Sequence, residues 1–277
     1  MDRESNYTER TFFQGQPTGT GFEGRRAEII HPTIAEVPSR VNEAINILRG
    51  NIQLSGSNIK AIAITSALTN EGKSSIAFRF AKSMAGLGKK TIFIDSDIRN
   101  SIIQSRYGIV GKKKGLSEYL CGSISKDKII YRTDDNCLDM IFTGALAPNP
   151  SELISGPLFQ ELMEYVRGLY DYVIVDTCPL NLVIDGLLVA KQCDGTVLVV
   201  ESGKTDRAQA EKAKQQMQYA DIRILGAVLN KAPVHEKRYG YGHYGYGYGL
   251  WLLWREIKVK EEKESTGDRK SCGGSES

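Results

Sequence analysis

The sequence lacks paired cysteines, long apolar runs and an apolar leader. Its five cysteines are widely scattered, with no CxxC pair and no histidine at metal-ligand spacing, which favours reduced thiols over disulfides or a zinc site. No apolar run approaches the roughly 20 residues that a membrane-spanning helix needs. The first residues, MDRESNYTERTFFQ, are polar and lack the apolar core of a signal peptide. We therefore expect a cytoplasmic protein whose membrane contact comes through a partner.

An excess of charge of one sign is also missing. The 36 lysines and arginines and the 33 aspartates and glutamates are interspersed, for a net charge of +3. Nucleic-acid-binding domains concentrate positive charge on one face or along one helix, so we expect no nucleic-acid partner. What is present, 41% hydrophobic and 25% charged residues in a chain of 277, is the composition of an ordinary globular domain.

Short apolar runs alternate with amphipathic segments through the middle of the chain. The runs are continuously apolar, which is typical of parallel strands buried on both faces. The alternation predicts an α/β fold, a doubly wound and mostly parallel sheet with helices on both sides. We expect strands at 61–65, 91–95, 137–142, 172–176, 196–200 and 224–230, and helices from about Ser39 and at 73–88, 157–170 and 205–220.

Composition divides the chain into three parts. Residues 1–35 are rich in Gly, Thr, Glu and Arg without periodicity, which predicts a flexible N-terminal arm. The α/β pattern occupies 36–233 and predicts one domain. Residues 234–277 form a C-terminal tail in which tyrosine and glycine alternate, a composition that cannot build a packed core.

The segment between the first strand and the following helix has the composition of a phosphate site. It reads SALTNEGKSS and contains Gly72-Lys73-Ser74. Consecutive backbone N–H groups and a helix N-terminus create a positive cradle for phosphate oxygens. Lys73 can reach the β- and γ-phosphates of a nucleotide, and the Ser74 hydroxyl can bind Mg²⁺. The alternative is an ordinary loop that happens to contain GKS.

This loop departs from the full P-loop pattern at one position. The pattern has a glycine five residues before Gly72, where this chain has Ala67. Asn70 stands where a positive φ is needed, and asparagine tolerates that conformation better than other residues with a side chain. We expect the nucleotide to contact Asn70, Glu71, Gly72, Lys73, Ser74 and Ser75.

Two carboxylate motifs end apolar runs, at the sheet edge where ligands of open α/β folds bind. The first is Asp95-Ser-Asp97-Ile-Arg99, whose charges are costly to bury unless they meet a cation, a phosphate or each other. The second is Asp176 in YVIVDTCP, the position of a Walker B carboxylate that holds the water shell of a metal. A structural salt bridge from Asp95 or Asp97 to Arg99, and a helix cap at Asp176, remain open as alternatives.

Together these motifs resemble those of the bacterial tyrosine kinase family. The resemblance covers about 36–248 and includes NPSELI (149–154) and GAVLN (226–230). It is strongest to the Gram-positive type, in which a two-span membrane adaptor activates a separate soluble kinase that regulates capsular or exopolysaccharide synthesis. The resemblance implies a P-loop NTPase fold similar to MinD and ParA, ATP and Mg²⁺ as cofactors, and recruitment to the inner face of the membrane through the adaptor.

The same resemblance implies roles for the motif residues. Lys73 and Ser74 bind ATP·Mg²⁺, and Asp95 orients or deprotonates the attacking tyrosine. Asp97 and Asp176 position the metal together with Ser74. The catalytic set is then Lys73, Asp95 and Asp97.

Contacts to adenine and to neighbouring copies are implied as well. Arg99 supports the phosphates or the local carboxylates, and Asn230 contacts adenine unless it is an ordinary loop residue. The ring-forming helix of the family carries ExxRxxR, and here the corresponding residues are Glu43, Asn46 and Arg49. Because the central arginine is missing, we expect a weaker ring.

The tail is the expected phosphate acceptor. Glycine gives each phenol a flexible backbone that can enter a cleft. We expect autophosphorylation between copies, a ring in the unphosphorylated state and a separate tyrosine phosphatase that resets the cycle. The alternative is a low-complexity tail that is never modified. The cluster consists of Tyr239, Tyr241, Tyr244, Tyr246 and Tyr248.

Two other functions compete with the kinase. A positioning ATPase of the MinD and ParA type has a signature lysine where this chain has Leu68, although its membrane-binding helix is comparable to LWLLW (250–254). A non-catalytic scaffold would bind the adaptor and use the nucleotide as a conformational switch. The intact Lys73 and the carboxylates favour the kinase over both.

Overall fold

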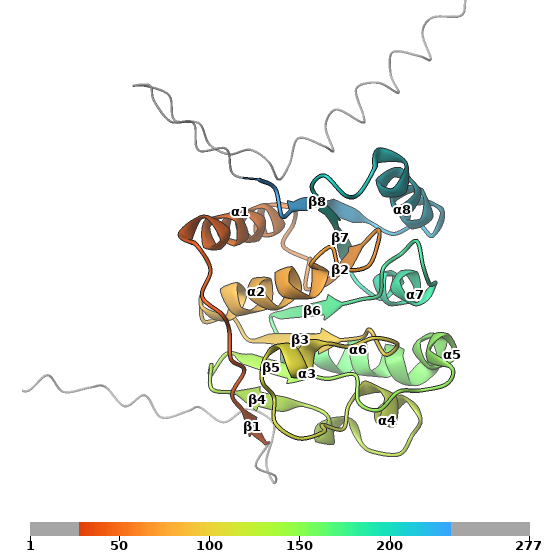
Figure 1. Ribbon diagram of the computed structural model, residues 1–277. Coiled ribbons are helices and arrows are strands. Elements are labelled where there is room, and N and C mark those ends of the chain that lie inside the picture. Colours follow the sequence, from red (N-terminus) through yellow and green to blue (C-terminus); the bar gives the residue numbers. More distant parts are fainter. Residues whose placement is uncertain (1–27, 234–277) are drawn as a thin grey trace, which may run out of the picture.

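Eight strands form one sheet, in the order β1-β4-β5-β3-β6-β2-β7-β8 (Figure 1). In the computed structural model, which describes residues 28–233, every strand pairing is parallel except that of β4 with β5. The predicted doubly wound, mostly parallel sheet is therefore confirmed. The strands are β1 Ile29–Ile30, β2 Ala61–Ser66, β3 Thr91–Asp95, β4 Tyr131–Thr133, β5 Leu138–Ile141, β6 Tyr172–Asp176, β7 Gly195–Glu201 and β8 Ile224–Asn230.

Helices cover both faces of the sheet (Figure 1). One face packs against α1, α2 and α3, and the other against α4 to α8. Across residues 28–233, none of the helices combines the length and apolar character that a membrane span requires. The helices are α1 Ser39–Leu54, α2 Lys73–Ala85, α3 Ile103–Arg106, α4 Leu116–Leu120, α5 Pro150–Ser155, α6 Pro157–Leu169, α7 Asp185–Lys191 and α8 Arg207–Tyr219, with a 3-10 turn at Lys126–Lys128.

Side chains of the central strands alternate between two apolar cores. In β2, Ile62 and Ile64 pack toward α2, whereas Ala61 and Ala63 pack toward the opposite layer of helices. All four side chains are fully buried. Because both faces of the sheet are covered, both sets of positions must be apolar, and this explains the continuous apolar runs of the sequence.

The predicted elements lie close to their observed positions. The six predicted strands end within one residue of the observed ones, and the helices within three. Two strands were not predicted, because β1 has only two residues and β4 only three, with an exposed Arg132 between buried neighbours. Ile29–Ile30 pairs with β4 and Ile30 is buried, so residues within the segment 1–35, which the sequence assigns to the arm, belong to the sheet. Residues 1–27 and 234–277 lie outside the described part.

Asp194 holds the start of β2, the strand that leads into the phosphate loop. Its Oδ2 accepts hydrogen bonds from the backbone N–H groups of Lys60 and Ala61, both at 2.8 Å. The Arg167 guanidinium donates to both carboxylate oxygens, at 2.8 and 2.9 Å. Partial burial by itself would raise the pKa of Asp194, but the hydrogen bonds from Ala61, Arg167 and Lys60 outweigh it and hold the pKa below its usual range.

We predict that Asp194→Ala lowers the free energy of unfolding at pH 7 by about 1–3 kcal/mol, because it leaves the N–H of Ala61 buried without a partner. A carboxyl with a depressed folded-state pKa contributes stability above its ordinary pKa and loses it as the pH falls through the folded value. The gap between wild type and variant, measured by urea unfolding, should therefore narrow at low pH. Asp171→Ala is the matched control, because Asp171 also accepts a backbone hydrogen bond beside the first residue of a strand, from the N–H of Lys90 next to β3. If the difference in free energy of unfolding between wild type and Asp194→Ala is independent of pH, the ionised carboxylate of Asp194 does not contribute this stability.

Candidate active site

The phosphate loop joins the end of β2 at Ser66 to the start of α2 at Lys73. Asn70 has φ 63°, the positive value expected from the sequence, and Gly72 has φ 91°. A Cβ on Gly72 would lie 2.2 Å from Nδ2 of Asn230, so the position requires glycine. The first intrahelical bond runs from Ile76 N to Gly72 O, which leaves the N–H groups of the first turn free, as in anion-binding helix termini.

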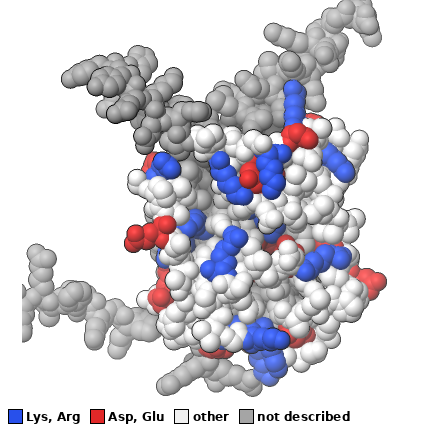
Figure 2. Space-filling model, in the orientation of Figure 1, with Lys and Arg blue, Asp and Glu red and all other residues white. Residues whose placement is uncertain are grey.

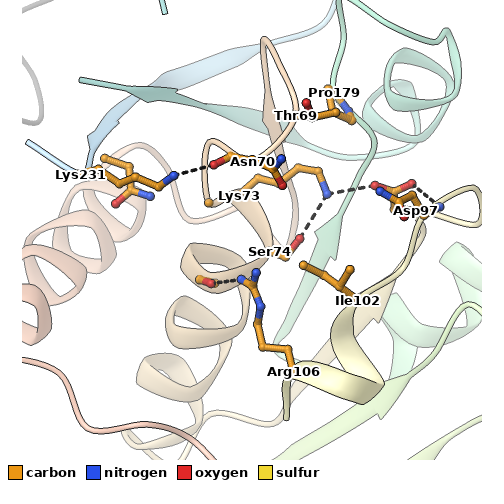
Figure 3. Close-up of a pocket in the computed structure, with 13 residues that line it drawn as sticks. Thr69, Asn70, Lys73, Ser74, Asp97, Ile102, Arg106, Pro179 and Lys231 are labelled. Atoms are coloured by element: carbon orange, nitrogen blue, oxygen red, sulfur yellow. Dashed lines mark hydrogen bonds and ion pairs between the residues drawn. The ribbon is translucent and has the colours of Figure 1, made fainter. Parts of the chain in front are cut away.

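A pocket of about 310 Å³ opens beside the first turn of α2 (Figure 3). In the orientation of Figure 2, lysine and arginine side chains predominate over the middle of the face, a distribution that favours an anionic ligand. The pocket brings together the predicted Asn70, Gly72, Lys73, Ser74, Ser75, Asp97 and Asn230, and adds Thr69, Asn100, Ile102, Arg106, Pro179 and Lys231.

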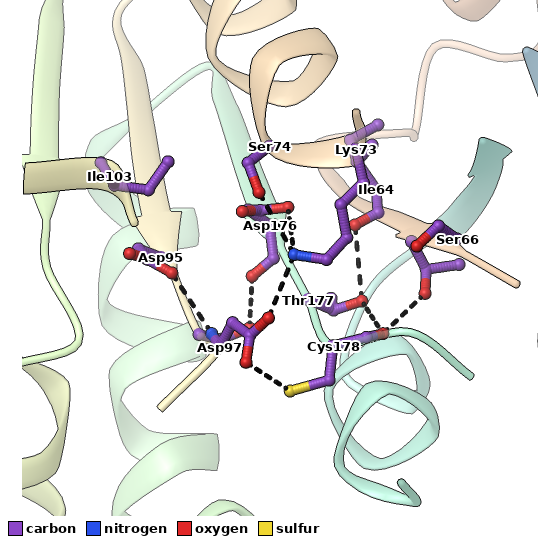
Figure 4. Close-up of polar contacts among 12 residues, drawn as sticks. Ile64, Ser66, Lys73, Ser74, Asp95, Asp97, Ile103, Asp176, Thr177 and Cys178 are labelled. Carbon is purple, nitrogen blue, oxygen red and sulfur yellow. Dashed lines mark hydrogen bonds and ion pairs between the residues drawn. The ribbon is translucent and has the colours of Figure 1, made fainter. Parts of the chain in front are cut away.

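Lys73 turns toward two carboxylates at one side of this pocket (Figure 4). Its Nζ lies 3.1 Å from Asp97 Oδ2 and 3.4 Å from Asp176 Oδ1, and it donates to Ser74 Oγ at 3.2 Å. Burial by itself would lower the pKa of Lys73, but the charges of Asp176, Asp97 and Asp95 outweigh it and raise the pKa. The carboxylates therefore favour the charged form of Lys73, whose side chain is almost fully buried.

Asp97 is held by donors from three segments. Besides Lys73, it accepts a bond from the thiol of Cys178 at 3.1 Å and one from the backbone N–H of Asn100 at 3.2 Å. Cys178 is buried two residues after Asp176, in the DxxP motif. The sequence predicted only a reduced thiol at this position. Its place within the DxxP motif, beside Asp176, could have indicated that it belongs to the site.

Asp95 is fully buried and faces Asp176 across the pairing of β3 with β6. It accepts hydrogen bonds from the Ser101 hydroxyl and from the backbone N–H of Asp97, the latter at 3.3 Å. Burial and then the charge of Asp176 raise the pKa of Asp95 to about 8. A carboxyl with a raised pKa binds a proton more strongly than an ordinary aspartate, although only its ionised form can accept one.

Asp176 offers an oxygen that suits a metal ion. Its Oδ2 is buried and has no hydrogen-bond partner within 28–233, and burial raises the pKa of this carboxyl against the attraction of Lys73. The hydroxyl of Ser74 lies beside it (Figure 4). Oxygen ligands of this kind fit Mg²⁺. In the described residues no group of three or more His, Cys, Asp or Glu is placed to hold a metal, so phosphate oxygens would have to complete the coordination.

Arg99 does not line the pocket. Its Nε donates to Asp185 Oδ2 at 2.5 Å and its Nη2 to Ser151 Oγ at 3.1 Å. The alternative of a salt bridge to Asp95 or Asp97 is therefore wrong, and Arg99 does not line the site expected to hold phosphates. Asp185 is buried at the start of α7, and no spacing in the sequence connects it with Arg99.

Glu71 shapes the loop from behind. Its buried carboxylate accepts bonds from the backbone N–H of Leu68 at 2.6 Å and from the Thr205 hydroxyl. It does not line the pocket, so a direct nucleotide contact through this side chain has no geometric support. Asn230 donates to the carbonyl of Glu71 at 2.8 Å and lines the pocket, which keeps its contact with adenine as a prediction.

The helix expected to join neighbouring copies is α1. Glu43 and Asn46 are exposed on it, whereas Arg49 is half-buried and donates to Ser83 Oγ on α2 at 2.7 Å. One arginine of the expected contact is therefore engaged within its own chain. The five tyrosines of the tail lie outside the described residues.

Comparison with known proteins identifies the family. The sequence matches the family described as AAA domain over residues 59–205. It is 38% identical over 215 residues to the tyrosine-protein kinase CpsD of Streptococcus agalactiae, a match that covers 78% of this chain and 93% of that protein. It is 34% identical over 211 residues to the tyrosine-protein kinase YwqD of Bacillus subtilis, covering 75% and 89%.

Solved structures agree with this assignment. The kinase domain of Escherichia coli tyrosine kinase ETK matches with a TM-score of 0.65 and 30% identity, covering 73% of this chain and 80% of that one. The chimerical protein CapA2B2 matches with a TM-score of 0.67 and 31% identity, covering 74% and 95%. The cell-division ATPase MinD of Pyrococcus furiosus, at 18% identity, covers 73% and 79% with a TM-score of 0.55 and shares the fold alone. The chain therefore belongs to the bacterial tyrosine kinase family.

Proposed function

We propose that the chain is an autokinase that transfers the γ-phosphoryl group of ATP to tyrosines in the tails of neighbouring copies. The observation that carries the proposal is the buried cluster in which Lys73 meets Asp97 and Asp176 beside the free N–H groups of α2. Nucleotide phosphates enter a site that already holds a cation and the oriented N–H dipoles of α2. Such preorganisation is the main source of catalysis in phosphoryl transfer.

Nucleotide binding changes the partners of Lys73. A bound γ-phosphate would offer Lys73, which already lines the pocket, an anionic partner besides Asp97 and Asp176, and its ammonium group would turn toward that phosphate. Ser74, Asp97 and Asp176 would then hold Mg²⁺, which supplies further positive charge to the phosphate oxygens when bound. These carboxylates would then keep a positive partner, since Mg²⁺ would stand where the ammonium group of Lys73 stood.

Asp95 is fully buried and does not itself line the pocket, so it would meet the phenol of the acceptor tyrosine only where the Ser101 hydroxyl now covers it. A free phenol has a pKa of about 10, and the raised pKa of Asp95, about 8, lies closer to it than that of an ordinary carboxyl. The Ser101 hydroxyl now donates to Asp95. The incoming phenol takes over this hydrogen bond, and Asp95 orients it and accepts its proton late in the transfer.

The tail supplies the acceptors and the regulation. Its tyrosines are far along the chain from the P-loop, so capture by a neighbouring copy is natural. Each phosphate adds about −1.5 to −2 charges, and a phosphorylated tail is repelled from a site lined by aspartates and ATP. The unphosphorylated chains then form a ring, and phosphorylation of their tails dissociates the ring. A tyrosine phosphatase removes the phosphates and allows the ring to form again. A two-span membrane adaptor recruits and activates the kinase, and the cycle controls capsular or exopolysaccharide synthesis.

Transfer between copies can be separated from transfer within one chain. Lys73→Met retains the tail but loses the cation, and a chain with all five tail tyrosines changed to Phe retains the site but loses the acceptors. We predict that neither variant alone gains phosphate with ATP and Mg²⁺, whereas the mixture phosphorylates the tail of Lys73→Met, as located by mass spectrometry. Lys82→Met, an exposed change on α2, is the matched control and should keep full activity. Tyrosine phosphate on Lys73→Met alone would refute the site.

The carboxylates should differ in what their loss affects. Asp95→Asn should lower the transfer rate by about 100-fold or more, the range of general base catalysis, with little change in ATP affinity. Asp97→Asn and Asp176→Asn should raise the Mg²⁺ concentration needed for half-maximal rate. Single-turnover kinetics and nucleotide titrations measure these quantities. Equal loss of ATP binding in all three variants would contradict the separate roles.

The missing arginine on α1 gives a test of assembly. Asn46 is exposed between Glu43 and Arg49, so Asn46→Arg restores the pattern of the family at low structural cost. We predict a shift to larger oligomers in light scattering of the unphosphorylated protein. Ser57→Arg, which adds the same charge in the loop after α1, should leave the mass unchanged. If both variants behave alike, α1 is not the contact.

A further inference from the structure

Arg106 is a cation in the nucleotide pocket without an acidic partner. The pocket is lined by three basic residues, of which two have acidic partners. Lys73 pairs with Asp97, and Nζ of Lys231 lies 3.1 Å from Oε2 of Glu201. Arg106 forms no ion pair within residues 28–233. Its guanidinium Nη1 donates to the hydroxyl of Ser75 (Figure 3).

The apolar core places Arg106 at this position. The next residue, Tyr107, is buried, and the centre of its ring lies 4.1 Å from that of Phe78 on α2. The backbone N–H of Thr33 donates to the carbonyl of Tyr107 at 2.8 Å and holds the end of α3 from the other side. Phe78 follows Ser75 by about one helical turn, so the packing of Tyr107 brings Arg106 level with the first turn of α2. No charge interaction is needed to keep it there.

We propose that Arg106 binds the α-phosphate of the nucleotide. The inference rests on the function proposed above and assigns a residue to one phosphate of its substrate. In a P-loop the lysine reaches the β- and γ-phosphates and the backbone amides cradle the α- and β-phosphates. Lys73 turns toward Asp97 and Asp176, whereas Arg106 approaches the first turn at Ser75 (Figure 3). This divides the pocket into a side for the transferred phosphate and a side for the phosphate next to the ribose.

The chemistry of arginine suits this role. A guanidinium group presents several N–H donors in one plane and binds two phosphate oxygens at once, or one phosphate and a neighbouring hydroxyl. Arg106 can keep its bond to Ser75 through one nitrogen and offer the others to the ligand. A simple structural tether between α3 and α2 would need the hydrogen bond but not the charge.

The test separates charge from tether with Arg106→Gln, which keeps a donor for Ser75 and removes the charge. Affinities for ATP, ADP, AMP and adenosine are measured by calorimetry without Mg²⁺, together with thermal unfolding of the free protein. We expect about tenfold weaker binding of ATP, ADP and AMP, the effect of one charge-assisted hydrogen bond. Adenosine binding and the melting temperature should not change, and Arg106→Lys should recover part of the loss.

Arg79→Gln is the matched control. Arg79 also lies on this side of α2, but it donates to the carbonyl of Ala35 at 3.0 Å and does not line the pocket. The Arg79→Gln variant should bind ATP, ADP, AMP and adenosine with the affinities of the wild type. A loss confined to ATP would move Arg106 to the γ-phosphate and overturn the assignment, and so would unchanged affinity for all four. If the wild type phosphorylates its tail and Arg106→Gln binds nucleotides as tightly as the wild type, the role of Arg106 is refuted and the kinase function stands. If the wild type binds no nucleotide, both the role of Arg106 and the kinase function are refuted.

Discussion

The ammonium group of Lys73 compensates carboxylates that are buried at the ends of two neighbouring strands. Asp97 and Asp176 lie within 3.4 Å of it, and Asp95 is buried next to them. Loss of one partner from a buried charge cluster costs about 3–5 kcal/mol. The end of β3, the end of β6 and the first turn of α2 are therefore coupled, because each contributes charges that the others need.

A second set of contacts holds the loops around this cluster. Arg99 joins the loop after β3 to α5 and α7 through Ser151 and Asp185. Glu71 joins the phosphate loop to the segment after β7 through the Thr205 hydroxyl. Neither network faces the pocket, so the site can exchange Lys73 contacts for phosphate contacts while its frame stays in place. This separation of frame and reacting groups is what preorganised catalysis requires.

Local patterns predicted much of this arrangement. Continuous apolar runs identified six strands within one residue, because burial on both faces excludes polar side chains from them. The positive φ of Asn70 followed from the geometry of a P-loop that lacks a glycine there. β1 and β4 carried no such signal, because strands of two and three residues are too short for any periodicity. The contact of Arg99 with Asp185 was not predicted, because Asp185 is 86 residues away and looks like an ordinary helix start.

Residue types and spacing were thus sufficient for the class of fold and for the position of the GKS loop and the carboxylates at the ends of strands, since these depend on neighbours in the chain. The packing of distant elements decided which charges meet. The register of β3 against β6 sets Asp95 opposite Asp176, and the contact of Tyr107 with Phe78 carries Arg106 to the pocket. Such pairings depend on how the sheet and the helices pack in three dimensions. Contacts between residues far apart in the chain produce no periodic pattern in the sequence.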